Sequence, residues 1–478
     1  MTKAQLDGLY MLLLGVLVLI SLSAILENVS PGPMLDFRAM YYPARCLIQH
    51  RDPYKESEVS RVYQAEGVYR SLDTATERQM VTRYGYLPSA FSLTVPFAML
   101  PWGPAHLLWI AVTVGSLIFA SFLIWSLGAN YAPVISGCLI GFLLANSELL
   151  ALRGMCAGIA VSLCVLAVLC FLRERFVLAG ILCFAVSLTV KPQDTGLVWL
   201  YFLLAGGIYR KRALQTLLVT VVLSLPVVLW VWLVAPQWIQ ELHSNILAYS
   251  VRGGINDPSL ASAGAHGIGM VISLQEVISV FWDDPRIYNL ATYLVCGPLL
   301  LVWIAITLRS RFSSKRAWIA LAAIAALSML PVYHRLYDAK LLLLTVPACA
   351  MLWAEGGLMG WLALLVNTAG FVVTGDLPWA ILLGLIRSLH LSRTGLSGQV
   401  LIAVQVFPAP LMLLVMSVFY LWVYVSHSSA TAISERPESY GEVHIEPALL
   451  DSGTNLKRPF SGVIPRLRIA SNLERGSR

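Results

Sequence analysis

The chain alternates between long apolar runs and short polar turns along most of its length. Most runs approach about 20 residues, the length that an α-helix needs to cross the hydrocarbon core of a bilayer. Strands of a membrane barrel would instead give weaker segments of about ten residues with alternating polarity. The pattern therefore predicts an all-α, polytopic membrane protein. The apolar runs lie near 9–26, 86–101, 104–127, 133–149, 154–172, 176–190, 195–209, 213–235, 287–308, 316–331, 338–354, 357–376, 378–390 and 398–425.

Three of the polar turns are strongly basic, and they orient the predicted helices. These turns lie at 173–175, 210–212 and 309–316. Lysine and arginine favour the cytoplasmic side of a membrane, so all three turns are expected there. Counting crossings from them assigns two long loops and two short turns to the opposite face. The segments are 27–85, 190–194, 236–286 and 331–338.

Two short runs fit this count only if they do not cross the membrane. The segment 86–103 is rich in proline, and we expect a re-entrant or interfacial helix that extends the first outer loop to 27–103. The run 378–390 needs the same interpretation. About twelve spans then form one membrane domain over 1–425. The polar tail 426–478 is expected to be disordered and cytoplasmic, with a basic end suited to anionic lipid headgroups.

The composition agrees with a polytopic membrane protein and argues against other classes of protein. The 478 residues are 58% hydrophobic and 12% charged, with a mean hydropathy of +0.73, whereas soluble domains carry about 25% charged residues. The net charge of +7 does not indicate nucleic-acid binding, because the basic residues lie in short turns between apolar runs. The eight cysteines show neither metal spacing nor a disulfide framework. The first run, 9–26, lacks a small-residue cleavage site, so we expect a retained helix.

A polar and aromatic stretch follows the first predicted helix. It reads PGPMLDFRAMYYPARCLIQHRDPY over 31–54 and contains Asp36. A carboxylate at the membrane boundary can act as a general base if it reaches a substrate hydroxyl. The alternative is a helix N-cap at Asp36, where a carboxylate suits the helix dipole. Position alone favours the cap.

Two later outer turns carry candidate cations. Lys191 ends a long apolar run just before a proline, where it can pair with a phosphate or simply extend to the interface. The turn 331–338 reads PVYHRLYD. Such clusters are usually interfacial anchors, but a histidine beside an arginine also suits the phosphoryl leaving group of a lipid.

The segment 84–109 reads YGYLPSAFSLTVPFAMLPWGPAHLLW. An interfacial helix carrying tyrosine and tryptophan fits this composition and could line a groove for a lipid tail. A plain helical hairpin is the alternative.

These short motifs gain specificity from their order along the chain. They are D-F-x-x-x-Y-Y-x-A-R at 36–45, R-D-P-Y at 51–54, Y-x-Y-x-P at 84–88, K-P at 191–192 and P-x-Y-H-R-x-Y-D at 331–338. The chain over about 9–425 thereby resembles glycosyltransferase family 87, a group of polytopic GT-C glycosyltransferases that includes polyprenyl-phosphomannose-dependent mannosyltransferases. The chain departs from the family near 146–158, where it has RGMCAG and many members have Gly-Gln. The acceptor preference of the family is therefore not carried over.

The resemblance implies a GT-C membrane fold with a long first outer loop. It also implies a polyprenyl-phosphate-sugar donor, used at the non-cytoplasmic face of the cell membrane on a lipid or glycan acceptor. Mannose is the sugar that the resemblance favours, and arabinofuranose or another sugar stays open. By motif, Asp36 matches the family's catalytic aspartate, Lys191 its lysine and His334 its late histidine. Further pocket candidates are Arg38, Tyr41, Tyr42, Arg45, Tyr54, Tyr86, Tyr337 and Asp338.

The residue chemistry fits the implied reaction. Asp36 can accept the acceptor's hydroxyl proton, and inversion follows from a single displacement without a second carboxylate as nucleophile. Charge that grows on the phosphate leaving group needs nearby cations. Lys191, His334 and Arg335 can supply them, and the chain has no D-x-D motif, so we expect a metal-independent enzyme without a cofactor.

Two other functions compete with this hypothesis. A transporter would place ionisable residues near the bilayer midplane on broken helices, whereas Glu148 and Arg153 lie near predicted helix ends. A lipid-linked glycan ligase or polymerase would use a large late outer loop rich in arginine and histidine. The loop 236–286 has few of either.

Overall fold

The computed structural model describes residues 1–29, 34–66, 75–259, 261–262, 271–388 and 395–434. These residues are mostly helical, and one two-stranded antiparallel sheet joins two turns that are far apart in the sequence. Most of the tail predicted over 426–478 lies outside the described residues. The following architecture is that of Met1–Thr431, which form one unit.

The helices and strands follow in this order. They are α1 (Lys3–Val29), α2 (Leu35–Ile48), α3 (Glu56–Ala65), α4 (Ala75–Thr82), η1 (Pro88–Ala90), α5 (Phe91–Ala98), α6 (Trp102–Gly128), α7 (Pro133–Ala145), α8 (Glu148–Arg153), α9 (Cys156–Leu172), α10 (Val177–Val190), α11 (Pro192–Leu204), α12 (Gly207–Val234), α13 (Trp238–Ser250), β1 (Val271–Ile272), α15 (Leu274–Ser279), α16 (Pro285–Arg309), α17 (Ser314–Leu327), β2 (His334–Arg335), η2 (Leu336–Thr345), α18 (Val346–Glu355), α19 (Gly357–Val373), α20 (Asp376–Ser388), α21 (Gly395–Val406) and α22 (Pro408–Ser434).

The prediction of an all-α, polytopic membrane protein is confirmed. Within the described residues, seven helices are long and apolar enough to cross a membrane, or up to eight if the bent pair α19 and α20 is one span. The seven candidates are Lys3–Val29, Trp102–Gly128, Pro133–Arg153, Gly207–Val234, Pro285–Arg309, Leu336–Glu355 and Pro408–His427. Shorter apolar helices, α9, α10 and α21, add to the bundle without meeting that length.

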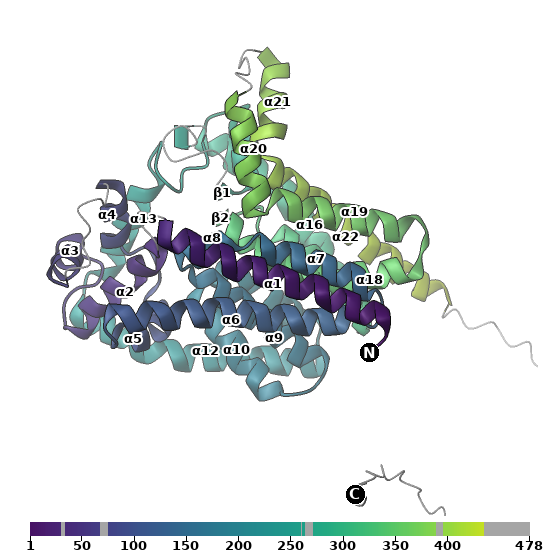
Figure 1. The fold of residues 1–478 in the computed structure, drawn as a ribbon, viewed down its shortest axis with the longest axis horizontal. Coiled ribbons are helices and arrows are strands. Elements are labelled where there is room, and N and C mark those ends of the chain that lie inside the picture. Colours follow the sequence, from purple (N-terminus) through teal and green to yellow (C-terminus); the bar gives the residue numbers. More distant parts are fainter. Residues whose placement is uncertain (30–33, 67–74, 260, 263–270, 389–394, 435–478) are drawn as a thin grey trace, which may run out of the picture. The chain divides into compact units, whose positions relative to one another are not determined.

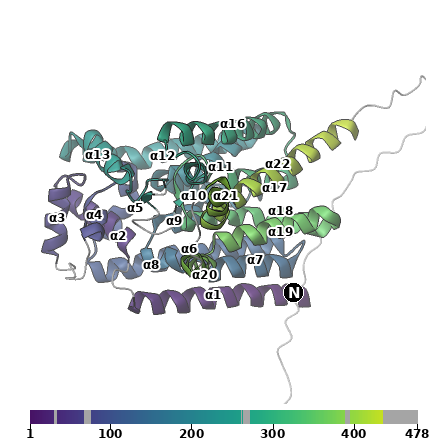
Figure 2. The same cartoon turned by 90° about the horizontal axis from the view of Figure 1, so that it is seen from above.

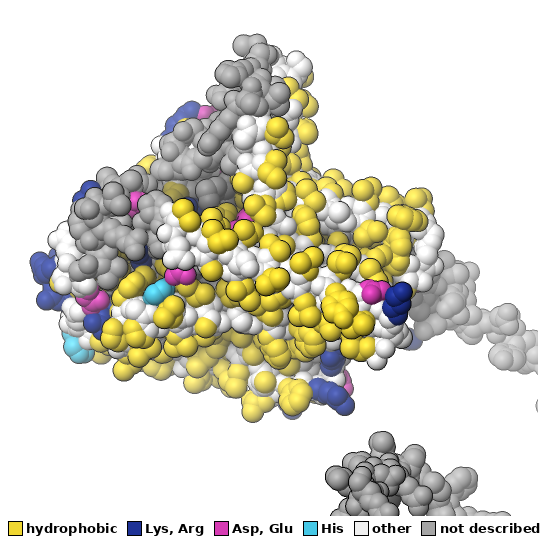
Figure 3. Space-filling model, viewed as in Figure 1, with side chains coloured by type: hydrophobic (Ala, Val, Ile, Leu, Met, Phe, Trp, Pro, Cys, Tyr) yellow, Lys and Arg dark blue, Asp and Glu magenta, His cyan; other side chains and the backbone are white. Residues whose placement is uncertain are grey.

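Burial separates helices at the centre of the bundle from helices at its surface. In the most apolar 18-residue stretch of Leu336–Glu355, 94% of the residues are buried within the protein, whereas in that of Gly207–Val234 only 6% are. A helix that is apolar all round belongs in a core, and an exposed apolar helix suits lipid. Figure 2 shows α1 and α16 at opposite flanks, with α9, α17 and α18 between them. Hydrophobic side chains cover the face shown in Figure 3, and charged side chains gather toward its two ends.

The basic turns 173–175, 210–212 and 309–316 lie at one end of the bundle. Arg212 donates a hydrogen bond to the Phe171 carbonyl oxygen at 2.9 Å and lies 3.8 Å from Glu174. The ring of Tyr209 stacks on Phe312 with centroids 4.3 Å apart. This arrangement agrees with the predicted common side for these turns.

The opposite end holds the predicted outer loops. Helix α12 begins beside the basic turns and ends next to α13, and α1 ends next to α2. Figure 1 shows α2, α3, α4, α5 and α13 gathered at that end. Neither short run forms a span-length helix by itself: α5 has eight residues, and α20 is bent by 69° from α19. The bent pair fits either one broken span or a re-entrant segment, so the interpretation of 378–390 stays a prediction.

Glycines allow α1 and α7 to pack with their backbones in contact. In α7, Gly137 and Gly141 form a G-x-x-x-G motif, which brings membrane helices close together. A Cβ atom on Gly141 would lie 2.3 Å from the Met11 carbonyl oxygen of α1, and one on Gly15 would lie 2.2 Å from the Gly141 carbonyl oxygen. Such contacts are with backbone, so a larger residue forces the two helices apart.

We predict that Gly141→Leu destabilises the protein by about 1–3 kcal/mol, the usual cost of overpacking a close interface. Thermal unfolding in detergent micelles measures this loss. Gly115→Leu is the matched control, because nothing lies within 4 Å of a Cβ atom at that position of α6. Equal melting temperatures for the two variants would contradict the close packing of α1 on α7.

Candidate active site

The Lys-Pro motif forms the single-residue junction between α10 and α11. Pro192 occupies the first turn of α11, where its missing N–H is tolerated. A residue before proline is driven out of the helical region, and Lys191 has φ −147° and ψ 73°. The junction therefore turns the Lys191 side chain away from both helix axes and into the protein, where the residue is 4% exposed.

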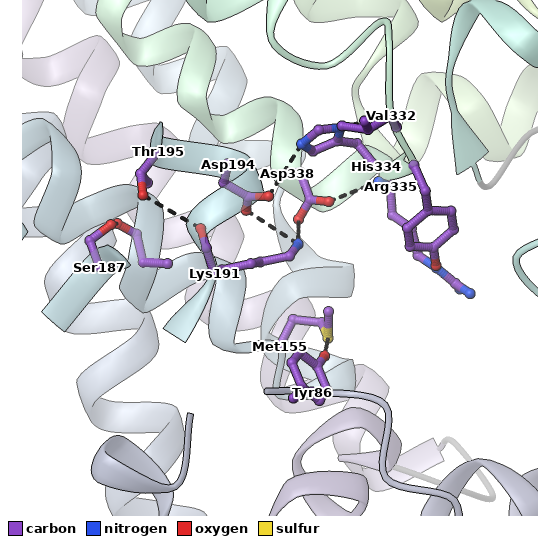
Figure 4. Close-up of polar contacts among 12 residues, drawn as sticks. Tyr86, Met155, Ser187, Lys191, Asp194, Thr195, Val332, His334, Arg335 and Asp338 are labelled. Atoms are coloured by element: carbon purple, nitrogen blue, oxygen red, sulfur yellow. Dashed lines mark hydrogen bonds and ion pairs between the residues drawn. The ribbon is translucent and has the colours of Figure 1, made fainter. Parts of the chain in front are cut away.

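The late outer turn is held as a strand. His334 and Arg335 form β2, which pairs with Val271 and Ile272 of β1 in antiparallel register. Successive side chains of a strand point to opposite faces. His334 therefore points toward Asp194, whereas Arg335 extends in another direction (Figure 4).

Four ionisable side chains meet in a buried cluster, called the Lys191 clamp below. Lys191 Nζ donates a short hydrogen bond to Asp338 and lies 3.2 Å from Asp194 Oδ2. His334 Nε2 lies 3.4 Å from Asp194 Oδ1. All four residues are at most 4% exposed (Figure 4). The clamp joins α10 and α11 to β2 and η2.

One hydrogen bond and one ion-pair contact of His334 indicate its charge. Its Nδ1 atom lies 3.0 Å from the Val332 carbonyl oxygen, which can only accept, so Nδ1 carries a hydrogen. Its Nε2 atom faces a carboxylate and also needs a hydrogen to attract it. Burial alone would lower the pKa of His334, but the Asp194 carboxylate outweighs burial and raises the pKa above its usual value. With His334 protonated, two cations balance two carboxylates in the clamp.

Asp36 lies at the start of α2 but is not its N-cap. The helix begins at Leu35, and Met34 is the capping residue, with φ 61° and no side-chain capping bond. The Met34 N–H donates to the Leu152 carbonyl oxygen at 2.7 Å, which ties α2 to the end of α8. The Asp36 Oδ2 atom is buried and has no hydrogen-bond partner. A carboxylate oxygen in this position is available to a ligand.

One cavity of about 350 Å³ receives five of the predicted site residues. They are Asp36, Tyr86, Lys191, Arg335 and Tyr337. The cavity lies between the first outer loop, the second outer loop, the Lys-Pro junction and β2. Sequence positions more than a hundred residues apart therefore meet here.

Arg335 supplies one of the cations that line this cavity. Its guanidinium stacks over the Tyr333 ring at 5.5 Å, and its Nη2 atom contacts the Asn256 Oδ1 atom at 3.3 Å. Its Nη1 atom makes no hydrogen bond with the described residues. Lys191 also reaches the cavity, over the Tyr337 ring at 5.5 Å, but the two aspartates of the clamp already partner its ammonium.

His334 and Asp338 lie behind the cavity wall. Neither lines the cavity, and His334 is fully buried. A direct contact of His334 with a donor phosphate was expected from the sequence, and the geometry instead gives it a place beside Asp194. The Asp338 carboxylate accepts a hydrogen bond from the Arg335 N–H at 2.9 Å. Both residues thus position Lys191 and Arg335.

The other predicted pocket residues pack inside the first outer loop. The Tyr41 hydroxyl donates to the Leu100 carbonyl oxygen at 2.8 Å, and Arg45 pairs with Glu66 at 2.7 Å. The remaining contacts hold α2 against its neighbours. They are Tyr42 on Tyr63 at 4.7 Å, the Tyr54 hydroxyl on the Tyr86 carbonyl oxygen at 2.9 Å, and Arg38 over Trp102 at 5.7 Å.

Arg38 lies in a different cavity from Asp36. That cavity has a volume of about 390 Å³ and is also lined by Glu27, Trp102 and His106. The geometry therefore separates Arg38 from the Asp36 site, although the two residues are one helical half-turn apart.

Several cavity residues had no signal in the sequence. Arg83 lines the cavity and its Nε atom donates to Glu56 at 2.9 Å. The Tyr249 hydroxyl donates to the Arg83 carbonyl oxygen at 2.5 Å and so fastens α13 to the end of α4. Asn256 lies in the same second loop. Asp194 is visible in the turn VKPQD, but nothing local marks it as a partner of both Lys191 and His334.

In the part of the chain that the structure describes, no three His, Cys, Asp or Glu side chains converge as ligands of a metal ion would. Comparison with protein-family models, curated proteins and solved structures found no match to this chain. A functional proposal therefore rests on the arrangement of the cavity and on the motifs of the chain.

We predict that the clamp contributes stability that depends on the charge of His334. Because the pKa of His334 is raised in the folded protein, this contribution is complete below about pH 6.5, the unfolded value. It is lost as pH rises through the folded-state value. The difference in melting temperature between wild type and His334→Gln should be largest at low pH and shrink as pH rises.

Thermal unfolding across a pH series measures this difference. His243→Gln is the control, because His243 is exposed on α13 and outside the clamp. Its curve should run parallel to wild type. A difference for His334→Gln that grows with pH would contradict the protonated histidine.

Proposed function

We propose that this protein is an inverting membrane glycosyltransferase of the family 87 kind. It moves a hexose, with mannose the favoured sugar, from a polyprenyl phosphate to a hydroxyl of a lipid or glycan acceptor. The single observation that carries the proposal is the cavity that joins Asp36, with its unpartnered carboxylate oxygen, to the cations Arg335 and Lys191. The resemblance of the motifs supplies the sugar donor.

The proposed reaction is one displacement at the anomeric carbon. The acceptor oxygen attacks that carbon while Asp36 takes the hydroxyl proton. The bond between the anomeric carbon and the phosphate oxygen breaks, and its electron pair leaves on polyprenyl phosphate. The added negative charge lies near Arg335 Nη1 and Lys191 Nζ, since preorganised cations stabilise charge that develops in a transition state. The product has the inverted configuration.

The place of the cavity in the bundle suits a donor with a long lipid tail. The cavity lies at the end where α1 and α12 leave the apolar bundle and α2 and α13 begin. A polyprenyl chain can then stay in the bilayer while its phosphate reaches Arg335. Moving each CH₂ group from lipid into water would cost about 0.8 kcal/mol. The basic turns at the other end support a non-cytoplasmic location in the cell membrane.

A proton- or ion-coupled transporter is the second candidate, and one observation favours it. Glu148, Lys340 and Asp376 are buried where α7 meets α8 and where α19 meets α20. Ionisable residues at broken membrane helices often mark transport paths. The lipid-linked glycan ligase or polymerase has less support. Among the described residues of the loop 236–286, those that line the cavity are Ile246, Tyr249, Ser250, Ile255 and Asn256, none of them basic.

We predict that Asp36→Asn lowers sugar transfer by at least ~100-fold, the usual scale for loss of a general base. Transfer of radiolabel from a panel of polyprenyl-phosphate sugars to lipid extract measures this, with and without EDTA. EDTA should leave wild-type transfer unchanged. Asp283→Asn is the control, since Asp283 pairs with Arg252 away from the cavity. Full activity of Asp36→Asn would reject Asp36 as base, and no transfer from any donor would favour the transporter.

We also predict that Arg335→Gln raises the KM for the donor by about 10- to 100-fold, the scale of one hydrogen bond to a charged group. The KM for the acceptor should change much less. Arg252→Gln, an arginine of the second loop that does not line the cavity, is the matched control. An unchanged donor KM in Arg335→Gln would remove Arg335 from phosphate binding.

A further inference from the structure

A second buried group of charges lies apart from the Lys191 clamp. It consists of Glu148 of α8, Lys340 of η2 and Asp376 of α20, each at most 4% exposed. Lys340 Nζ donates to the Asn146 carbonyl oxygen at 2.6 Å and lies 4.0 Å from Asp376 Oδ1. Asp376 Oδ2 accepts a hydrogen bond from the Leu149 N–H at 2.9 Å. These contacts connect η2 to the break between α7 and α8 and to the break between α19 and α20.

The charges of this group do not balance. Two carboxylates face one ammonium, so the group would carry one net negative charge if all three were ionised. Taking an uncompensated charge out of water costs several kcal/mol, and a buried carboxyl avoids that cost by taking up a proton. The Lys191 clamp is neutral, because the charges of Lys191 and protonated His334 balance those of Asp194 and Asp338.

The hydrogen bonds indicate which carboxyl holds the proton. Asp376 receives a backbone N–H and lies beside Lys340, and both contacts favour its ionised form. Each carboxyl has one buried oxygen without a hydrogen-bond partner, Glu148 Oε2 and Asp376 Oδ1. The other oxygen of Asp376 holds the Leu149 N–H, and Lys340 lies nearer to Asp376. Glu148 therefore gains less from ionisation than Asp376 does.

Other charged residues do not compensate Glu148. Helices α1, α2 and α6 also pack against α8. Their charged residues and histidine near the adjoining ends are Glu27, Asp36, Arg38 and His106. The groups that act electrostatically on Glu148 are Asp376 and Lys340, and Arg153 at the far end of α8 is not among them.

This group is connected to the walls of the Asp36 cavity at both ends. Helix α8 runs from Glu148 to Arg153, and the Leu152 carbonyl oxygen accepts the hydrogen bond from Met34 that fixes the start of α2. Met155, just beyond α8, lines the cavity. On the other side, Lys340 follows Asp338 of the clamp by two residues in η2. A change of charge at Glu148 therefore affects the cavity wall next to α8 and the wall next to η2.

We propose that Glu148, Asp376 and Lys340 form a proton-binding site that holds one exchangeable proton on Glu148 and sets the packing of α8 and η2 around the cavity. The proton keeps the group neutral. Its loss at high pH leaves one uncompensated charge, and this charge loosens the junction of α8, α20 and η2.

Infrared spectroscopy of the purified protein tests this directly. Protonated carboxyl groups have a carbonyl band that carboxylates and amides lack. The wild type minus Glu148→Gln difference spectrum should contain this band, and the band should disappear as pH rises. Asp376→Asn should also lose the band, because one carboxylate and one ammonium then balance without a proton. Glu174→Gln, at an exposed glutamate, is the matched control and should show no change.

A thermal unfolding series gives a readout that does not depend on any enzymatic activity. Wild type should lose stability as pH rises, and Glu148→Gln should lose less, since an amide stays neutral; the contribution of His334 is present in both proteins and cancels. A difference spectrum without the carbonyl band, or a band that persists in Asp376→Asn, would overturn the proposal. Equal pH dependence of stability in wild type and Glu148→Gln would overturn the coupling to packing.

Discussion

The burial of Lys191 between two aspartates is the interaction on which the rest of this structure depends. A lysine that is only 4% exposed is tolerable only if its charge is matched and its hydrogen bonds are made. Asp338 and Asp194 provide the match, and His334 restores neutrality on the far side of Asp194. Removing one partner of such a pair typically costs about 3–5 kcal/mol, because the other charge is then left uncompensated. The clamp therefore fixes where α10, α11, β2 and η2 meet.

The clamp also decides which side chains face the cavity. Once His334 is turned toward Asp194, the alternation of a strand leaves its neighbour Arg335 free to face the cavity. The first outer loop completes the site from the other side, because the hydrogen bond from Met34 to Leu152 anchors the helix that carries Asp36. A carboxylate with an unpartnered oxygen and an arginine with an unbonded Nη1 atom then line the same cavity, and the proposed sugar transfer uses both.

The sequence predicted which site residues lie at the same face of the membrane, but not which way their side chains point. Counting spans from the basic turns predicted that Asp36, Lys191 and the turn 331–338 share one face, and the first two line one cavity with Arg335 and Tyr337. Which of His334 and Arg335 faces that cavity depends on pairing with Val271 and Ile272, more than 60 residues away. The residues around His334 and Arg335 do not by themselves indicate this strand pairing. Tyr41, Tyr42 and Tyr54 show the same limit, since a buried aromatic core and an aromatic pocket have the same composition.

Two further features of the structure could not be predicted from the sequence, and each has a physical reason. Helices such as α9 and α10 are apolar but short, so composition alone cannot tell a span from a buried core helix, and the predicted count of about twelve exceeds the seven or eight candidates among the described residues. Glu148 lies near a predicted helix end, and nothing local in the sequence marks Lys340 and Asp376 as its neighbours. Only the folding of the two helix breaks onto η2 brings them together.

Cryo-electron microscopy of the protein with polyprenyl phosphate shows directly whether the Asp36 cavity binds the phosphate of a lipid donor. We expect density for the phosphate within hydrogen-bond distance of Arg335, beside Asp36, with the lipid tail leaving the cavity toward the apolar surface of the bundle. Lipid density at another site, with the Asp36 cavity holding no phosphate at saturating ligand, would contradict this expectation.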